Sequence, residues 1–398
     1  MKNKYSILIP TFNRRKYLEK TIQTVLDQNY KDYELIISDS GSTDDTIEFL
    51  NQLKHPNIKI FIPKKKLSEV ENFEFILDKA SSEWVSIIGD DDGITPNFFN
   101  TLDKVTEKYK NIQAISSKAA YYYHENVDDL YGDRVVSYNY VSDLLIKKNS
   151  KIHLLMCLMG LKNRNDIPSL YTTGVIKREL IEKIKRKSQN KFFHSIIEDY
   201  YSMVAILFET NHFVRVEKPL FWVGSSKNSS GKGLSVYENN KNVENYLKLS
   251  EKVSEELHRV GISSIYYLEA IYKHPYISNF WKSKFINIFT LAYAYLDIQS
   301  RRNTDRIKTD LSISAIISII FQEVKNKKNS KVSFYFYIFI LKTLFFFKKI
   351  NLKIIKIFSF IKKKMYKSIF LTINSNDRKT YSSIPVCNKI ILENVKKN

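Results

Sequence analysis

The stretch that decides the fold is SILIPTFNRRKYLEKTIQTVLDQNYKDYELIISDSGSTDDT, residues 6–46. Its first apolar run, Ser6–Pro10, is rich in Ile and predicts a buried strand. Apolar residues then recur at helical spacing from Arg15 to Gln28, which predicts an amphipathic helix. A second strand is expected at Tyr33–Ser38, followed by a polar turn and a helix at Asp45–Leu53. This alternation is typical of a parallel sheet covered by helices.

The same alternation continues along the next 40 or so residues of the chain. We expect a strand at Ile58–Ile62, a helix at Phe73–Lys79 and a strand at Trp84–Ile88. In open sheets of this kind, ligands bind beyond the carboxyl ends of the strands. Polar clusters stand at three of these ends, namely Thr11–Asn13, Asp39–Thr43 and Asp90–Asp92. Their coincidence predicts a ligand site at this edge of the sheet.

The acidic run Asp90–Asp92 is unusual because it directly follows an apolar strand. Adjacent carboxylates repel each other, and a nearby cation relieves that repulsion. Carboxylate oxygens suit a hard divalent ion, Mg²⁺ or Mn²⁺, whose shell substrate phosphates can complete. The alternative is a solvated acidic turn with no ligand. The position at the ligand edge of the sheet favours the metal site.

The order of these motifs resembles family 2 glycosyltransferases, which have the GT-A fold. The matching residues are Pro10-Thr11-Phe12-Asn13-Arg14, Gln28-Asn29-Tyr30, the turn Asp39–Asp44, and a later run of Asn72, Ala80 and WVSIIGDDDGITP. The resemblance covers about 90 residues, with four motifs in the family's order and spacing. It implies an α/β GT-A domain with a mostly parallel central sheet and helices on both faces.

The resemblance also implies roles for particular residues. The nucleotide and sugar of the donor would be bound by Pro10, Thr11, Asn13, Asp39, Ser40, Asn72, Asp90 and Thr173. The metal would lie at Asp90, Asp91 and Asp92. Aligning on Pro96 places Gly89 where many members have the first aspartate, so which two carboxylates bind the metal stays open; Asp91 is the first choice.

A second acidic motif, Glu198-Asp199, begins a predicted helix at 198–208. By resemblance, Asp199 is the general base that takes the proton from the acceptor hydroxyl, with Glu198 beside it, and the anomeric configuration inverts. The alternative is a pair of carboxylates that stabilise a helix N-terminus. A strand at Leu170–Ile176 would line the sugar site. The loop at 225–233 lacks the family's Arg-x-His element, which Lys227 or Lys232 could replace, and His194 and His212 are expected to be structural.

Charge is concentrated at the end of the chain. Residues 301–398 hold 22 Lys and Arg against 5 Asp and Glu, within a total net charge of +21. The stretch Asn351–Lys367 reads as a basic amphipathic helix suited to an anionic membrane surface, and Val332–Phe347 is too short to span a bilayer comfortably. The alternative is a helical appendage with solvated lysines. We expect a GT-A domain at residues 1–235 and a helical, basic region at residues 236–398.

Two cysteines in no CxxC pattern and no apolar secretory signal favour a reducing, cytoplasmic compartment, with peripheral attachment to the inner face of the membrane. The expected reaction moves a sugar from a nucleotide diphosphate donor, preferably a UDP-sugar, to a glycan or lipid-linked acceptor. Two rivals are a basic nucleic-acid-binding protein and a sugar nucleotidyltransferase. The first lacks an exposed groove of stacking aromatics, and the second lacks a glycine-rich loop after the first strand. Neither the sugar, the acceptor nor the oligomeric state follows from the sequence.

Overall fold

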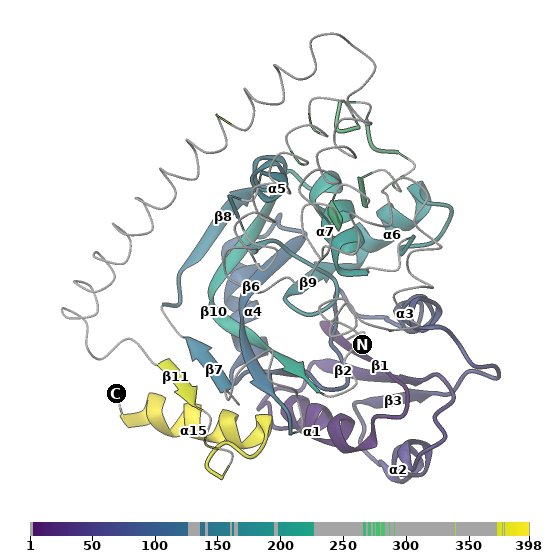
Figure 1. The fold of residues 1–398 in the computed structure, drawn as a ribbon, viewed down its shortest axis with the longest axis vertical. Coiled ribbons are helices and arrows are strands. Elements are labelled where there is room, and N and C mark those ends of the chain that lie inside the picture. The colour runs from purple at the N-terminus through teal and green to yellow at the C-terminus, as the bar shows by residue number, and fades with distance from the viewer. Residues whose placement is uncertain are drawn as a thin grey trace.

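We analysed a computed structural model of the 398-residue chain (Figure 1). The structure describes residues 3–125, 136–139, 142–159, 161–162, 166–194, 198–226, 266–267, 270–271, 274, 276–278, 280–282, 286, 290, 339, 372–375, 377 and 379–397.

The first part of the described chain alternates strands and helices. Its elements are β1 (Tyr5–Thr11), α1 (Arg15–Leu26), β2 (Tyr33–Asp39), α2 (Thr46–Gln52), β3 (Ile58–Phe61), α3 (Glu69–Leu77), β4 (Trp84–Ile87), β5 (Gly93–Ile94) and α4 (Phe98–Lys108). The later elements are β6 (Ala114–Tyr123), β7 (Val136–Asn139), β8 (Leu145–Asn149), α5 (Ser150–Leu158), β9 (Gly174–Lys177), α6 (Arg178–Lys187), α7 (Glu198–Glu209), β10 (His212–Ser225), β11 (Thr372–Ser375) and α15 (Ile384–Lys397).

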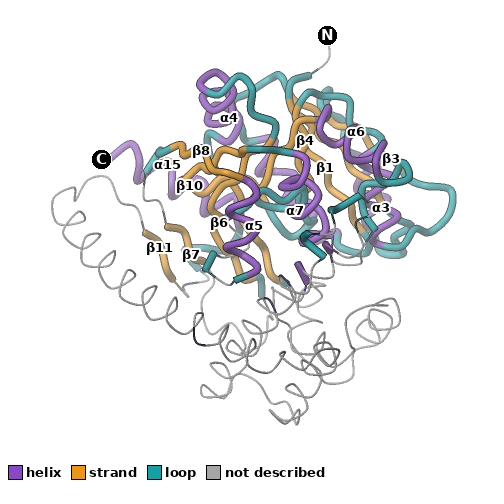
Figure 2. The backbone as a smooth tube through the Cα atoms, turned by 90° about the horizontal axis from the view of Figure 1, so that it is seen from above, coloured by secondary structure: helices purple, strands orange, loops and turns teal. Residues whose placement is uncertain are grey.

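One mixed sheet organises the described part of the molecule, in the order β11-β7-β6-β9-β4-β1-β2-β3 (Figures 1 and 2). The four strands from β4 to β3 run parallel, as predicted, and β9 continues the sheet antiparallel to β4. The long strand β10 pairs in parallel with β6 and antiparallel with β5 and β8. The α/β class is therefore confirmed, with a parallel part that carries the predicted site and an antiparallel part beside it.

Alternating side chains of β1 divide the core between the two faces of the sheet. Leu8 packs with residues of α3, α5, α6 and α7, whereas Ile7 and Ile9 pack with residues of α1, α2 and α4. The predicted helices therefore cover both faces. This double cover explains why the strand sequences are nearly continuous apolar runs.

Most predicted boundaries lie within a few residues of the observed ones, and two differences have clear causes. α3 begins at Glu69, four residues earlier than expected, because Ser68 and Glu71 form a capping box. The strand predicted from Leu170 begins only at Gly174, because Thr172 and Thr173 adopt positive φ angles of 40° and 101°. A strand cannot include such residues.

The last described residues return to the N-terminal part of the chain. β11 pairs antiparallel with β7, and α15 packs against α1 near the lower left of Figure 1. α15 lies within the region expected to be helical, although no helix was predicted at its own residues, and the strand β11 was not expected. The division at residue 235 remains a prediction. The predicted helices at 332–347 and 351–367 lie outside the described residues, apart from Phe339.

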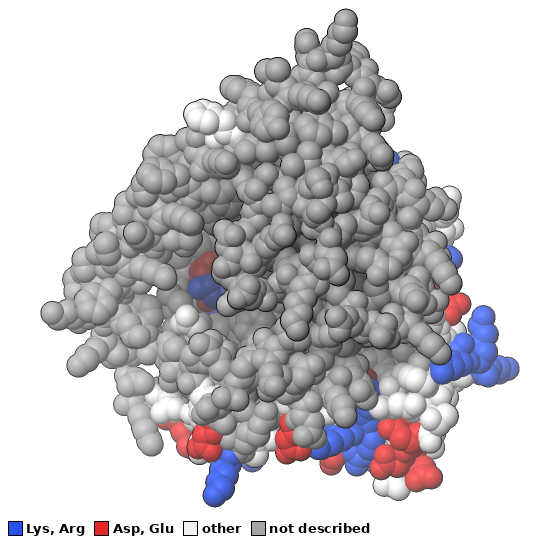
Figure 3. Space-filling view, viewed as in Figure 1, with Lys and Arg blue, Asp and Glu red and all other residues white. Residues whose placement is uncertain are grey.

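Among the residues that the structure describes, no helix combines the length and the apolar character that crossing a bilayer requires. On the face in Figure 3, the described Lys and Arg side chains lie among Asp and Glu side chains.

Candidate active site

The parallel strands bring Thr11 and Asp39 side by side, since these residues are partners in the register of β1 and β2. The Asp39 carboxylate is fully buried, and its Oδ1 accepts hydrogen bonds from the backbone N–H groups of Gly41 (2.9 Å) and Ser42 (2.7 Å). Its Oδ2 is also buried and accepts no hydrogen bond from the residues that the structure describes. A buried carboxylate oxygen of this kind is suited to a ligand N–H or O–H donor.

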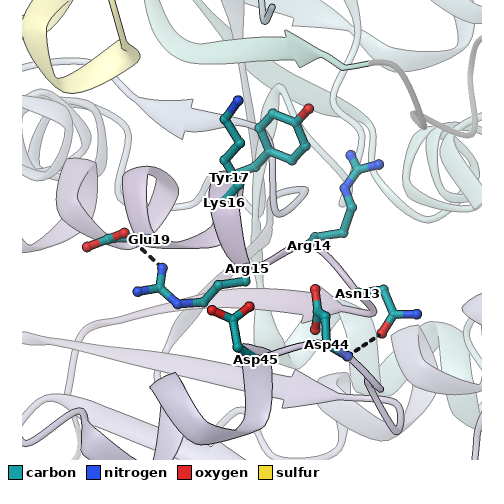
Figure 4. Close-up of a pocket in the computed structure, with 8 residues that line it drawn as sticks. All are labelled: Asn13, Arg14, Arg15, Lys16, Tyr17, Glu19, Asp44 and Asp45. Atoms are coloured by element: carbon teal, nitrogen blue, oxygen red, sulfur yellow. Dashed lines mark hydrogen bonds and ion pairs between the residues drawn. The ribbon is translucent and has the colours of Figure 1, made fainter.

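The loop after β1 is tied to the turn after β2. Asn13 has a positive φ of 55°, its N–H donates to Ser42 Oγ at 2.7 Å, and its Oδ1 accepts from the Thr43 N–H at 2.7 Å. Beside these two segments lies a pocket of about 400 Å³, shown in Figure 4, lined by Asn13, Arg14, Arg15, Lys16, Tyr17, Glu19, Asp44 and Asp45. The polar clusters Thr11–Asn13 and Asp39–Thr43 therefore form one rigid wall beside this pocket.

The first two carboxylates of the acidic run face the loop after β1. Asp90 Oδ2 accepts a hydrogen bond from Thr11 Oγ1 at 2.8 Å, and its Oδ1 lies 3.2 Å from Arg14 Nε. Asp91 Oδ2 accepts from Arg14 Nη2 at 2.6 Å and from Ser226 Oγ at 2.7 Å. A single guanidinium thus joins both carboxylates, in a place where their oxygens converge.

Asp92 differs from its neighbours because the backbone uses its carboxylate. Oδ2 accepts hydrogen bonds from the Gly89 N–H and from Thr172 Oγ1, both at 2.7 Å, and Oδ1 accepts from the Gly224 N–H at 2.8 Å. These three fixed donors hold the loop in shape and leave the Asp92 oxygens little capacity to bind a metal. Of the three predicted ligands, Asp90 and Asp91 therefore have the more suitable geometry.

Burial makes this cluster electrostatically costly. It raises the pKa of Asp90 to about 7 against the opposing effect of Arg14. Burial and the charge of Asp91 likewise raise the pKa of Asp92 to about 7. The effect of Arg14 on the pKa of Asp90 is smaller than that of burial, so a further cation would stabilise this carboxylate. No three His, Cys, Asp or Glu side chains in the described part of the chain are already arranged to hold a metal ion.

Tyr171 connects the acidic run with the second acidic motif. Burial raises its pKa well above the usual value, and the charges of Asp92, Asp91 and Asp199 add to this effect. All three carboxylates therefore lie within electrostatic reach of one phenol. Its hydroxyl would be only 2.7 Å from a Cβ at Gly89, so Tyr171 fills the space that a side chain at position 89 would need.

Two strained residues follow Tyr171. Thr172 and Thr173 both have positive φ, which is costly for β-branched residues. Thr173 Oγ1 is buried and makes no hydrogen bond with any residue described. The next position must be glycine, because a Cβ on Gly174 would come within 2.0 Å of the Ser169 carbonyl oxygen. Strain beside a buried hydroxyl marks a segment shaped for a ligand.

The second acidic motif begins α7, as predicted. Asp199 is half-buried, and its backbone carbonyl accepts a hydrogen bond from Ser202 Oγ at 2.9 Å. Glu198 occupies the first position of the helix. The start of α7 is tied to the strand before the acidic run, because Ser202 Oγ accepts a hydrogen bond from the Leu170 N–H at 3.2 Å and the Leu170 carbonyl accepts one from the Ile87 N–H at 2.9 Å.

Other predicted residues have structural contacts. Asn72 is buried and holds α3 to β2, because its Oδ1 accepts from Ser38 Oγ at 2.6 Å and its Nδ2 donates to the Ser38 carbonyl at 3.2 Å. Ser40 is buried, and its N–H donates to the Thr11 carbonyl at 3.0 Å. Pro10 lies opposite Ser38 in the register. We interpret Asn72 as a packing residue that supports the end of β2, next to the loops that line the pocket.

The remaining predicted candidates are less informative. His194 Nε2 contacts the Ser188 carbonyl oxygen at 2.9 Å, and His212 is exposed at the start of β10, which agrees with structural roles. Lys227 and Lys232 lie outside the described residues.

Sequence reasoning did not assign roles to Arg14, Tyr171 or Ser226. Arg14 was part of a motif already noted, and its position beside Asn13 was the available signal. The contacts of Ser226 with Asp91 and of Tyr171 with Gly89 join residues more than 80 positions apart, so no local pattern could have shown them.

Comparison with known proteins was consistent with this geometry. Residues 6–163 match the model of glycosyl transferase family 2. The chain is 37% identical over 113 residues to the GalNAc(5)-diNAcBac-PP-undecaprenol beta-1,3-glucosyltransferase of Campylobacter jejuni. This match covers 27% of the chain and 37% of that protein. It is 26% identical over 219 residues to an uncharacterized glycosyltransferase of Haemophilus influenzae, covering 54% of this chain and 79% of that protein.

The first of these matches spans little more than a third of the relative's own length. Among solved structures, TarS from S. aureus in complex with UDP-GlcNAc superimposes with a TM-score of 0.46 at 14% identity, over 80% of this chain and 89% of that one. The family match and the sequence relatives, rather than this superposition, support the proposals below.

Proposed function

We propose, on the premise that residues 6–163 form a family 2 glycosyltransferase domain, that this chain transfers a glycosyl group from a nucleotide diphosphate sugar to a glycan or lipid-linked acceptor. The observation that carries the proposal is the arrangement of Asp39 and the Asp90–Asp91 pair around Thr11 at one edge of the sheet, with the start of α7 tied to the neighbouring Leu170. Neither rival function gains support from any of these contacts.

The donor nucleotide is assigned to the wall formed by the loops after β1 and β2. Asp39 Oδ2 is a buried acceptor, which fits an imide N–H of uracil or a ribose hydroxyl. We therefore favour a UDP-sugar. Thr173 Oγ1, a buried hydroxyl on the strained segment before β9, is the matching candidate for the sugar.

A divalent cation fits Asp90 and Asp91. Both are carboxylates and both already face one positive group, the guanidinium of Arg14, while burial raises the pKa of Asp90 despite that group. When bound, Mg²⁺ or Mn²⁺ supplies positive charge that stabilises the departing nucleotide diphosphate. Asp92 keeps the loop that carries these two residues in its shape.

Asp199 is the proposed general base. It stands at the start of α7, which Ser202 ties to Leu170, the residue before Tyr171, and such a carboxylate suits a group that receives the proton of the acceptor hydroxyl. Attack from the side opposite the leaving group inverts the anomeric configuration. Glu198, the neighbouring residue of α7, is proposed to assist at the same position.

The acceptor and the cellular site are proposed from two different observations. The similar C. jejuni protein is named for an undecaprenol diphosphate substrate, so a lipid-linked acceptor in surface polysaccharide synthesis is our first choice. The basic excess of residues 301–398 fits the same choice, because it suits an anionic membrane surface on the cytoplasmic side.

The test is a donor screen in which nucleotide sugars are incubated with the protein and Mn²⁺ or Mg²⁺, and release of free nucleotide diphosphate is measured. We expect one donor to be turned over. Asp199→Asn should reduce turnover at least a hundredfold while UDP binding stays within twofold. The matched control is Asp32→Asn, at the opposite edge of the sheet, where Asp32 Oδ1 accepts from the Lys4 N–H at 2.9 Å. Near-normal turnover by Asp199→Asn would refute the base assignment.

A further inference from the structure

Arg14 is the buried cation of the site. It directly precedes α1, its side chain is 11% exposed, and its guanidinium carbon lies 5.2 Å from the centre of the Tyr17 ring. The guanidinium reaches Asp91 Oδ2 at 2.6 Å and Asp90 Oδ1 at 3.2 Å. In Figure 4 its side chain extends away from Asp44 and Asp45, whereas Arg15 bonds Glu19.

The backbone of Arg14 is fixed while its side chain is long. The preceding residue, Asn13, is held to the turn after β2 by hydrogen bonds with Ser42 and Thr43. Rotation of the Arg14 side chain can therefore change the partner of its guanidinium without moving the strand end. A fixed backbone with a long, rotatable side chain is what a displaceable ion pair requires.

Arg14 and a divalent cation need the same oxygens. A metal bound to Asp90 and Asp91 would take carboxylate oxygens that now face the guanidinium, and the two cations would repel each other. A displaced guanidinium in a largely buried place needs another anion, because an uncompensated buried charge is strongly unfavourable. The diphosphate of a nucleotide is an anion that suits a planar guanidinium.

We propose that Arg14 holds Asp90 and Asp91 until a divalent cation and a nucleotide diphosphate arrive together, whereupon its guanidinium moves from the carboxylates to the diphosphate. This inference rests on the proposed function and adds a coupling between metal and nucleotide. Metal alone binds weakly, since it must displace Arg14 with no replacement partner. Metal and nucleotide strengthen each other's binding, and the coupling is reciprocal.

The test measures Mn²⁺ binding by calorimetry with and without UDP for the wild type, Arg14→Gln and Arg186→Gln. Arg14→Gln removes the competing charge and is expected to bind Mn²⁺ alone at least tenfold more tightly than the wild type. Its gain in Mn²⁺ affinity on adding UDP should be at least tenfold smaller than that of the wild type. Arg186→Gln is the matched control, because Arg186 is an exposed residue of α6 that does not line the pocket, so both affinities should stay unchanged.

Several outcomes would overturn the coupling. One is that Arg14→Gln binds Mn²⁺ alone no more tightly than the wild type, and another is that it keeps the full effect of UDP. Should Arg14→Gln fold poorly, Arg14→Lys decides the question. Because lysine is a shorter cation, its Mn²⁺ affinity without UDP and its gain in affinity with UDP should both lie between those of the wild type and those expected for Arg14→Gln. Donor turnover with unchanged Mn²⁺ coupling would refute only this inference. Absence of binding by UDP and by every other nucleoside diphosphate in every variant would refute the proposed function itself.

Discussion

Asn388 provides the sharpest test of how the end of the chain supports the site. It lies in α15 and is 5% exposed. Its Oδ1 accepts a hydrogen bond from Trp222 Nε1 at 2.8 Å, and its Nδ2 donates to the Ile94 carbonyl at 2.9 Å. Ile94 belongs to β5, which directly follows the acidic run, and Trp222 pairs with Gly93 in the same ladder. One side chain therefore fastens both strands next to the carboxylates.

We predict the effect of Asn388→Leu from these two bonds. Leucine has a similar size, so little cavity forms, but the Trp222 N–H and the Ile94 carbonyl lose their buried partner. Each unsatisfied group costs about 1–3 kcal/mol, so the free energy of unfolding should fall by roughly 2–6 kcal/mol. Most of this loss should appear as a lower urea midpoint at an unchanged m-value.

The measurement is urea unfolding followed by tryptophan fluorescence, which reports on Trp222 together with Trp84 and Trp281. Lys389→Leu is the matched control, because Lys389 is the exposed neighbour in the same helix and should change the stability by less than about 0.5 kcal/mol. If Asn388→Leu unfolds within that same margin of the wild type, then α15 does not brace β5 and β10, and the reasoning is refuted.

Three further predictions follow from single side chains. Burial acts to raise the pKa of Glu34, but hydrogen bonds from Lys59, Ser6 and Ser81 outweigh it and lower the pKa to about 2. The folded value lies below that of the unfolded chain, so this contribution is present above about pH 4.5 and is lost as the pH falls toward 2. The stability gap between the wild type and Glu34→Gln, up to about 3 kcal/mol at pH 7, should therefore shrink in urea unfolding at pH 3; a constant gap contradicts the assignment. Asp92→Ala leaves two backbone N–H groups and Thr172 without their acceptor, so it should lower the free energy of unfolding by roughly 2–4 kcal/mol. Asp91→Ala, by contrast, should mainly weaken Mn²⁺ binding. Equal destabilisation by both substitutions in urea unfolding would refute this division of roles. Gly174→Ala should prevent stable folding or cost at least about 3 kcal/mol, since its Cβ would meet the Ser169 carbonyl oxygen, and a normal thermal midpoint would contradict this.

The strand ends that carry the candidate site were predictable because their signals are local. The strand ends at Thr11, Asp39 and Asp90–Asp92 are read from short apolar runs followed by polar residues, and the parallel register aligns such ends automatically. The start of α3 could also have been read locally, since Ser68 and Glu71 form a recognisable capping pattern.

The late start of β9 was not predictable from pattern. The apolar content of residues 170–176 favours a strand, yet Thr172 and Thr173 are held in positive φ by contacts with distant residues, among them Asp92 and Ser117. Tertiary contacts overrode local preference at this point, and they did so beside the candidate sugar site.

Alternating apolar strands and helices, and carboxylates at the strand ends, were determined by the sequence alone, because periodicity and residue type are properties of neighbouring positions. Tertiary structure alone decided which carboxylates are available. The Asp92 carboxylate accepts hydrogen bonds from the nearby Gly89 N–H and, from remote segments, from the Gly224 N–H and Thr172 Oγ1. Asp90 and Asp91 share the guanidinium of Arg14, and Asn388 of α15 bonds Trp222 and Ile94 beside the acidic run. The physical reason is that hydrogen bonds and ion pairs act over a few ångströms, so they depend on which distant segments the packed core brings together.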